Sequence, residues 1–238
     1  KRRIKRFFPT DHADCPTEVS TPIIAREGWS RISGFLILAL VVQWFGGWWL
    51  AAPFWMLVLL VVQFFRDPPR NVPKGDHLIV SPAHGKIVSI QPDKDPFSGD
   101  ACVRISVFMN IFSVHSNRIP IAGKITDIKH TRGRFFNASL AKASSENERC
   151  GIQITTPEGI QVSSVQIAGW VARRILTYVK PGETVVAGQR YGFIRFGSRV
   201  DIYVPEDAKI VAKLGKWVLS GSDIIAQLTS QEASVDSV

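Results

Sequence analysis

Cysteine is scarce in this sequence of 238 residues, which contains only Cys15, Cys102 and Cys150. Their spacing matches no metal-ligand pattern, and an odd, sparse set is typical of a reducing compartment rather than of a disulfide framework. The sequence also contains neither a His-x-His nor a His-Glu-x-x-His pair, which a zinc hydrolase would need. We therefore expect no metal site.

Two further absences narrow the function. The sequence has no Gly-x-Ser-x-Gly elbow of a serine hydrolase, and it has none of the usual nucleic-acid-binding motifs. Lys and Arg nevertheless total 29 against 20 Asp and Glu, which gives a net charge of +9. A basic chain favours an anionic partner, and seven tryptophans favour anionic membrane lipid over nucleic acid. We expect no nucleic-acid partner.

Charge is also absent from the whole stretch 32–65. The stretch is too long for a single crossing helix, which needs about 20 residues. Gly46-Gly47 and Pro53 interrupt it, so we predict a membrane-associated helical hairpin with arms at roughly 32–45 and 50–65. The tryptophans typical of a membrane interface gather around its turn, at Trp44, Trp48, Trp49 and Trp55.

Basic residues flank this hairpin on both sides, with Arg31 before it and Arg66, Arg70 and Lys74 after it. Positive charge at both ends predicts that both ends lie on the cytoplasmic side of the cell membrane. The alternative is a buried hairpin in a soluble protein, which the hydropathy disfavours. A secretory signal peptide is also disfavoured, because the stretch is too long and too far from the start.

The sequence outside the hairpin divides into four further segments. A basic N-terminal segment, 1–31, precedes the hairpin, and a proline-rich linker, 66–76, follows it. Residues 77–228 contain short β runs separated by turns, and 229–238 read as a flexible polar tail. A weak helix around Gly169 to Tyr178 is the one exception that we expect in the β domain.

Internal repeats refine the expected fold. Pro82, Pro120 and Pro205 each stand three residues before a Gly or Ala that is followed by Lys-Ile. A second pattern, Gly-x-x-Val-x-x-Gly, occurs at 182–188 and again at 215–221. These repeats predict a mainly β fold, a small folded-over sandwich or barrel similar to the barrel-sandwich hybrid folds, preceded by the helical hairpin.

One dipeptide has a specific chemical possibility. Gly197-Ser198 interrupts a strand-like pattern, and glycine allows backbone conformations in which the serine hydroxyl reaches the preceding carbonyl carbon. Attack there would form an ester, and elimination from the ester would cut the chain and leave a pyruvoyl group. An ordinary bulge or turn is the simpler interpretation, since Gly221-Ser222 is a second such pair.

Two histidines are candidates for proton transfer. His84 lies in the first Pro-x-x-Gly corner, and His115 follows an apolar run. Each taken alone is more often a structural residue than a catalytic one.

Seven motifs together resemble one family, the short bacterial and archaeal type of phosphatidylserine decarboxylase. They are Phe64-Phe65-Arg66-Asp67-Pro68, Ser81-Pro82-Ala83-x-Gly85-Lys86, Val107-Phe108-Met109, Val114-His115-x-Asn117-Arg118-Ile119-Pro120, Glu146-Asn147-Glu148-Arg149, Gln166-Ile167-Ala168-Gly169-x-Val171-Ala172-Arg173-Arg174-Ile175 and Arg195-Phe196-Gly197-Ser198-Arg199-Val200-Asp201. The resemblance extends from about Gly28 to Leu228.

The resemblance implies that residues 77–228 form a catalytic domain and that a proenzyme cuts itself between Gly197 and Ser198. The products are a β chain, 1–197, and an α chain, 198–238, that begins with a pyruvoyl group derived from Ser198. The amine of phosphatidylserine would form a Schiff base with this covalent cofactor, and loss of CO₂ would give phosphatidylethanolamine. His115 matches the family's histidine for proton transfer.

The sequence departs from the family pattern where the family usually has Asp in the self-cleavage relay, because His84 stands there. Cys150 replaces a family Asn, and we interpret it as a buried structural residue. Two alternatives therefore stay open, a processing-deficient proenzyme and a catalytically silent, membrane-tethered β-sandwich that binds a partner. The sequence also leaves open whether the chain forms a homo-oligomer.

Overall fold

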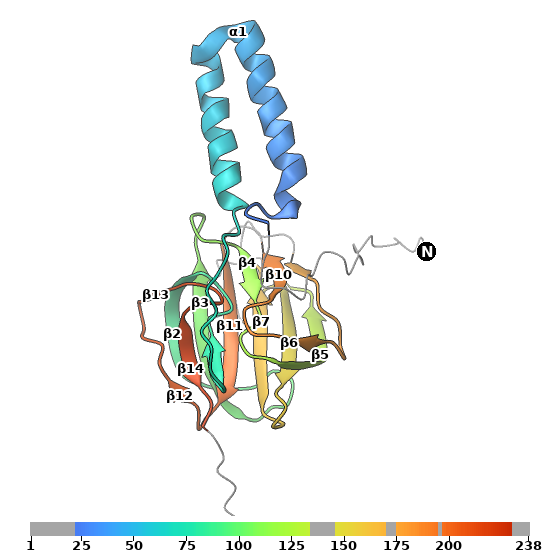
Figure 1. The fold of residues 1–238 in the computed structure, drawn as a ribbon, viewed down its shortest axis with the longest axis vertical. Coiled ribbons are helices and arrows are strands. Elements are labelled where there is room, and N and C mark those ends of the chain that lie inside the picture. Colours follow the sequence, from blue (N-terminus) through green and yellow to red (C-terminus); the bar gives the residue numbers. More distant parts are fainter. Residues whose placement is uncertain (1–21, 134–145, 170–174, 195–196, 230–238) are drawn as a thin grey trace, which may run out of the picture.

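The computed structural model describes residues 22–133, 146–169, 175–194 and 197–229. A helical hairpin stands on one end of a mainly β body, and both of its ends join the body at that end (Figure 1). The predicted fold class, a β body preceded by a helical hairpin, is confirmed. Parts of the predicted 1–31 segment and 229–238 tail lie outside the described residues.

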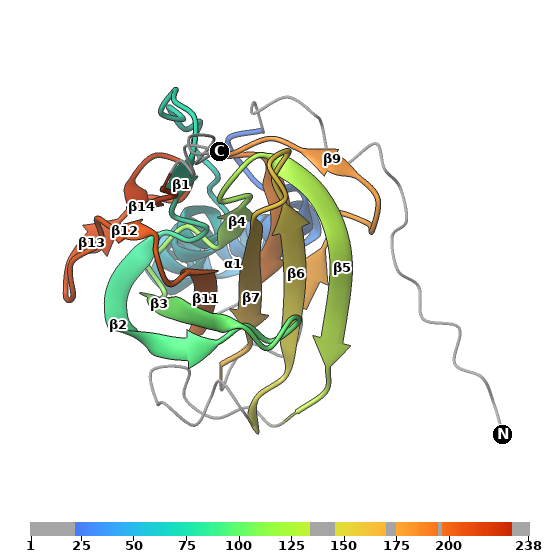
Figure 2. The same ribbon diagram turned by 90° about the horizontal axis from the view of Figure 1, so that it is seen from below.

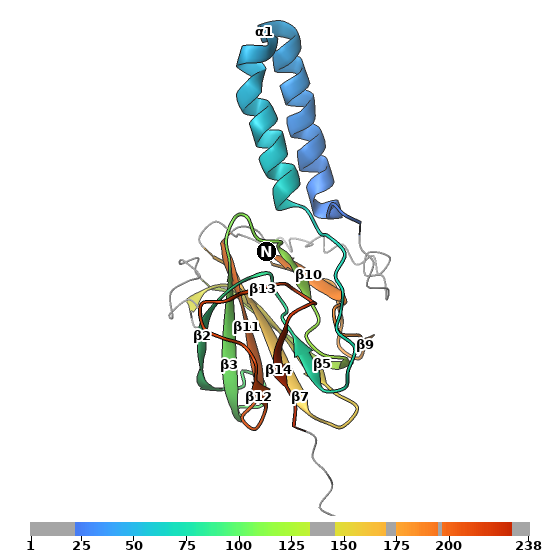
Figure 3. The ribbon, with the colours of Figure 1, turned by 60° about the vertical axis from the view of Figure 1, so that its left-hand side comes forward.

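The hairpin is formed by α1, Trp29–Phe64, which follows a short 3₁₀ turn, Arg26–Gly28. Gly47 has φ 74° and ψ 178°, which are not helical values, and the chain reverses there into two antiparallel arms (Figures 1 and 3). Glycine tolerates this conformation because it lacks a Cβ. Each arm has a length of about 25 Å at the helical rise, close to the hydrocarbon thickness of a bilayer.

Apolar side chains cover the outside of both arms, with nothing packed against most of them. Trp49 is 89% exposed and Met56 72% exposed. A single polar contact joins the arms within the described structure, in which Trp55 Nε1 donates to Gln43 Oε1 at 2.9 Å. The length and composition of this segment suit a membrane-crossing element.

An eight-stranded sheet forms most of the β body, and it curls strongly (Figure 2). Its strand order is β13-β2-β3-β11-β7-β6-β5-β9, and every neighbouring pair is antiparallel. The strands are β2 (Gly85–Lys94), β3 (Ala101–Met109), β5 (Gly123–Thr131), β6 (Arg149–Thr155), β7 (Gln161–Ile167), β9 (Thr184–Val185), β11 (Ser198–Pro205) and β13 (Trp217–Val218).

Two three-stranded sheets complete the body, with orders β1-β14-β12 and β4-β10-β8. Their strands are β1 (Leu78–Val80), β4 (Ser116–Arg118), β8 (Ile175–Thr177), β10 (Arg190–Ile194), β12 (Lys209–Ile210) and β14 (Ile224–Gln227). One apolar core joins them to the inner face of the large sheet, because Ile79 and Ala226 pack in the same cluster as Val200 and Ile202.

The weak helix predicted around Gly169 to Tyr178 is wrong where the structure describes it. Ile175–Thr177 forms β8, which pairs with β10, and residues 170–174 lie outside the described ranges. This short apolar run is a strand because it pairs with a neighbouring strand. Sequence periodicity alone cannot distinguish a helix from a strand in so short a run.

The sequence repeats correspond to a repeat in the sheet. β9 pairs at Gly123, at the start of β5, and β13 pairs at Gly85, at the start of β2. The strand order is accordingly symmetric about the boundary between β11 and β7, with β2 and β13 on one side matching β5 and β9 on the other. Positive φ occurs at the glycines that bound both repeats, Gly182, Gly188, Gly215 and Gly221.

Candidate active site

Three strand ends meet at the end of the β body that carries the hairpin. β2 begins at Gly85, β3 ends at Met109 and β11 begins at Ser198. The register places Ser198 opposite Met109 and Lys86 opposite Phe108, so β2 and β11 flank the same end of β3. The predicted His84 and Ser198 therefore share this end of the sheet.

Ser198 is fully buried at the first position of β11. Its side chain shares the inner face with Val200 and Ile202, since alternate residues of a strand face the same side. Among the described residues its Oγ has no hydrogen-bond partner, which is costly for a buried hydroxyl and uncommon outside functional sites. The preceding Gly197 has φ 58°, with no atom within 4 Å of a Cβ built there.

His115 lies directly under the hairpin. Its ring is fully buried and packs on the ring of Phe64, at 4.2 Å between centroids, with Phe193 at 6.4 Å. Burial lowers the pKa of His115 to about 3, and a hydrogen bond with the Ser113 backbone opposes the shift only in part. The imidazole is therefore neutral at pH 7 and can accept a proton.

His84 is hydrogen-bonded to the residue that precedes His115. The backbone N–H of Val114 donates to His84 Nδ1 at 3.1 Å. Burial, reinforced by the charges of Arg70 and Arg66, lowers the pKa of His84 to about 4. The ring is thus neutral at pH 7, and because Nδ1 accepts a hydrogen bond we assign its proton to Nε2. His84 consequently offers an N–H donor from Nε2 rather than a base.

A polar chain extends from β3 across the inner face toward β8. Asn117 Nδ2 contacts Met109 Sδ at 3.9 Å, and Asn117 Oδ1 accepts from Gln166 Nε2 at 2.8 Å. Thr177 Oγ1 donates to Gln166 Oε1 at 3.0 Å. Asn117 is thereby held beside Met109, the residue opposite Ser198.

Sequence reasoning missed a buried ionic network between the hairpin and the site. Asp67 is fully buried, and its Oδ1 accepts from Arg118 Nη2 and from Ser116 Oγ, both at 2.8 Å. Arg190 lies 3.6 Å from Asp67 Oδ2 and forms two 2.8 Å bonds to Glu27. Glu27 precedes the hairpin and Asp67 follows it, so the network clamps the two hairpin ends to β10 and to β4, which pair with each other.

The one signal for this network in the sequence was the polarity change after the apolar run, at Arg66-Asp67. Backbone pairing supports the clamp, because Ala25 N donates to Phe65 O and Asp67 N donates to Ile23 O, both at 2.7 Å. The segment that enters the hairpin and the segment that leaves it consequently run side by side.

No cluster of three or more His, Cys, Asp or Glu suited to a metal occurs in the part of the chain that the structure describes. Cys150 is buried, with its Sγ 3.3 Å from Thr177 Oγ1. Burial raises the pKa of this thiol, which keeps it protonated. Its surroundings agree with the structural role predicted for it.

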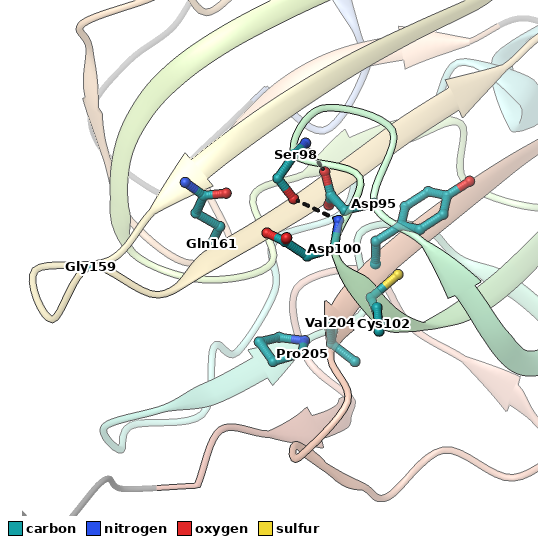
Figure 4. Close-up of a pocket in the computed structure, with 10 residues that line it drawn as sticks. Asp95, Ser98, Asp100, Cys102, Gly159, Gln161, Val204 and Pro205 are labelled. Carbon is teal, nitrogen blue, oxygen red and sulfur yellow. Dashed lines mark hydrogen bonds between the residues drawn. The ribbon is translucent and has the colours of Figure 1, made fainter.

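A shallow pocket of about 280 Å³ lies at the opposite end of β3 and β11 (Figure 4). Cys102 and Pro205, which pair at that end, line it together with Asp95, Asp100 and Gln161. Burial raises the pKa of the Cys102 thiol to about 11, so the pocket holds no thiolate nucleophile at neutral pH. Ser198, His84 and His115 are not part of it.

Comparison with known proteins identifies the family of this chain. The profile of the family "Phosphatidylserine decarboxylase" matches residues 57–226. A phosphatidylserine decarboxylase proenzyme of Nitrosomonas eutropha is 51% identical over 206 residues, covering 87% of this chain and 95% of the relative. Proteins of the same name from Burkholderia mallei and Aromatoleum aromaticum are each 50% identical, over 210 and 207 residues, covering 88% and 87% of this chain and 97% and 96% of the relatives. The chain therefore belongs to the phosphatidylserine decarboxylase family.

Proposed function

We propose that this chain is a proenzyme that cuts itself between Gly197 and Ser198 and then converts phosphatidylserine into phosphatidylethanolamine and CO₂. The observation that carries the proposal is the buried Ser198 Oγ, which has no hydrogen-bond partner among the described residues and follows a glycine at φ 58°. Family membership supplies the reaction, since relatives at about half identity are named for it.

Besides one water molecule, self-cleavage needs only groups that this chain contains. Ser198 Oγ attacks the carbonyl carbon of Gly197, and the C–N bond between the two residues breaks as an ester forms. Removal of the Ser198 Cα proton then expels the Gly197 carboxylate from Cβ. The resulting dehydroalanine tautomerises to an imine, and water releases ammonia from it and leaves a ketone. The chains 1–197 and 198–238 remain together through the pairing of β11 with β3 and β7.

We assign proton transfer to His115. Its ring is neutral at pH 7, so it can accept the proton that Ser198 Oγ loses. We assign His84 to the same step as a donor, because its Nε2–H is free to stabilise negative charge that develops on the Gly197 oxygen. This role differs from that of the family Asp, which accepts rather than donates.

The residues around Ser198 fit a pyruvoyl group at the start of β11. Ser198 would provide its carbons, and the inner-face position opposite Met109 and near Asn117 would hold it. The group would supply a ketone that binds the substrate amine and withdraws electrons as CO₂ leaves. Phe64, Phe65 and Phe193 form an aromatic cluster beside His115 that excludes water and favours loss of a charged carboxylate as neutral CO₂.

The hairpin would bring this site to the lipid. We infer that it inserts into the cell membrane with the β body on the cytoplasmic side, since basic residues flank both of its ends. Ile111 and Phe112, in the loop after β3, are about half exposed, and Arg66 donates to Phe112 O at 2.7 Å. A second apolar contact with the membrane would therefore lie beside the site.

Release of CO₂ from phosphatidylserine labelled in the serine carboxyl tests this proposal. The full chain in lipid–detergent micelles should release label and yield phosphatidylethanolamine, and Ser198→Ala should do neither and should stay uncut. Ser222→Ala is the matched control, because Gly221-Ser222 is the other candidate pair, and it should behave as the parent chain. An uncut parent chain that releases no CO₂ would refute the proposal and favour a silent or processing-deficient protein.

A further inference from the structure

Arg70 lies in the segment that connects the hairpin to β1, and its backbone is fixed on both sides. Asp67, three residues before it, is fully buried in the ionic network. Val72, two residues after it, packs against Gly188, where a Cβ would lie 2.3 Å from Val72 Cγ2. Contacts on both sides therefore hold the backbone at Arg70 in place.

One edge of the Arg70 guanidinium is buried with nothing to bind. Its Nε and Nη2 atoms are inaccessible to solvent and have no hydrogen-bond partner among the described residues. These two nitrogens form a planar pair of donors that matches two oxygens of one anion. A desolvated guanidinium edge is costly unless it is paired, so the geometry points to an anionic ligand.

Arg70 and the charged residues that act on it, Arg118, Arg66, Asp67 and Asp223, together carry a net positive charge. Burial lowers the pKa of Arg70, and repulsion from Arg118 and Arg66 adds to the shift while Asp67 and Asp223 oppose it. Asp67 is already shared among Arg118, Ser116 and Arg190. Asp223 Oδ2 accepts the Leu219 N–H at 2.8 Å. Neither carboxylate forms a hydrogen bond with Arg70 Nε or Nη2, although Asp67 Oδ2 also has no hydrogen-bond partner among the described residues.

This cationic site adjoins the proposed chemistry. Arg70 and Arg66 both lower the pKa of His84 through their charge, which places them within electrostatic reach of its ring. Arg66 is held by its bonds to Gln63 O and Phe112 O at 2.7 Å, so it contributes a fixed positive field. Arg66 donates from both Nη1 and Nη2, whereas Arg70 Nε and Nη2 have no hydrogen-bond partner among the described residues.

Phosphatidylserine carries two anionic groups, and the chemistry distinguishes between them. An arginine on the carboxylate would stabilise the group that must leave as neutral CO₂, and so would stabilise the ground state more than the transition state. The phosphodiester keeps its charge throughout the reaction. An arginine bound to it therefore stabilises the ground state and the transition state equally and does not raise the barrier between them. We propose that the Arg70 Nε/Nη2 edge binds the phosphodiester of phosphatidylserine, with Arg66 adding to the field. This inference rests on the proposed function.

Two lipids separate this role from a structural one. Phosphatidylserine has the amine, the carboxylate and the phosphodiester, whereas O-hexadecyl-L-serine has the amine and the carboxylate without the phosphodiester. In Arg70→Ala, kcat/KM for phosphatidylserine should fall by about 30-fold, the usual range for one charge-assisted bidentate contact. For the ether lipid, kcat/KM as a substrate, or its inhibition constant as a competitor, should change by less than about 2-fold.

Two further variants define the contact. Arg70→Lys keeps the charge but loses the planar donor pair, and it should fall between the parent and Arg70→Ala. Lys74→Ala removes one positive charge from an exposed position of the same segment, so it should leave both lipids unaffected. Cleavage at 197/198 is measured first on a denaturing gel, and Arg70→Gln replaces Arg70→Ala if the alanine variant stays uncut.

Several results would overturn the proposal. An equal loss on both lipids would assign Arg70 to the fold, as would failure of the Ala, Gln and Lys variants to be cut. Unchanged turnover of phosphatidylserine in Arg70→Ala would show that no phosphodiester binds there. A parent chain that decarboxylates neither lipid would instead contradict the proposed function, so the two failures are distinguishable.

Discussion

Asp67 is the residue on which the clamp between hairpin and β body depends. Replacing it by Asn keeps the shape of the side chain and removes its charge. Arg118, fully buried, would keep its 3.0 Å bond to Gly188 O but would lose its carboxylate partner. Arg190 would keep Glu27 but lose the second carboxylate of the network.

The size of the effect follows from the burial of the pair. Removing one partner of a buried ion pair costs about 3–5 kcal/mol, because the other charge stays desolvated. At about 2–4 °C per kcal/mol for a chain of this size, the thermal midpoint of Asp67→Asn should drop by about 10 °C. The measurement is near-UV circular dichroism in detergent, made in a Ser198→Ala background so that one covalent chain unfolds.

Two variants check the reasoning. Asp76→Asn changes an exposed carboxylate of the same connecting segment, and its midpoint should equal that of the parent. Adding Arg118→Met to Asp67→Asn removes the stranded charge and should restore part of the loss. A midpoint for Asp67→Asn within about 2 °C of the parent would show that the network contributes no stability, and the argument for the clamp would fail.

The remaining predictions concern the cleavage site and the two histidines. Gly197→Ala should slow cleavage several-fold on a timed gel, because alanine at φ 58° costs about 1 kcal/mol; an unchanged rate would show that this conformation is not required. His84→Asp should still be cut, because its carboxylate can accept the Val114 N–H and take the accepting role of the family Asp, whereas His84→Phe, which has neither a donor nor an acceptor, should not be cut; equal cutting of both would dismiss the role of His84. In the Ser198→Ala background, stability should fall as the pH drops below about 6.5, because the unfolded histidines then bind protons that folded His84 and His115, with pKa values of about 4 and about 3, resist. Urea unfolding followed by tryptophan fluorescence should show this loss, smaller in His115→Gln, and a flat profile from pH 7 to 4.5 would contradict it.

Local patterns were enough to predict the hairpin and the β body. The uncharged run and Gly46-Gly47 located the turn, which the structure places at Gly47. The repeated glycine–valine spacing predicted two equivalent corners, which appear as β9 on β5 and β13 on β2. Both signals depend on residues close together in the chain.

Contacts between distant residues could not be predicted in the same way. Asp67 meets Arg118 across 51 positions and Glu27 meets Arg190 across 163, and nothing in the sequence pairs these particular charges. The tautomer of His84 likewise depends on Val114, 30 residues away. The sequence indicated Ser198 and His115 through family motifs, but the free edge of Arg70 is visible only once its neighbours are known.

The central claim is that Ser198 attacks the Gly197–Ser198 peptide bond, cuts the chain there and becomes the first residue of the new 198–238 chain. The intact mass of the purified full chain tests it most directly. Two fragments joining at 197/198, of which the 198–238 fragment has the mass of a pyruvoyl rather than a serine terminus, would agree with the claim. A single uncut mass, or a 198–238 fragment that retains an intact serine, would contradict it.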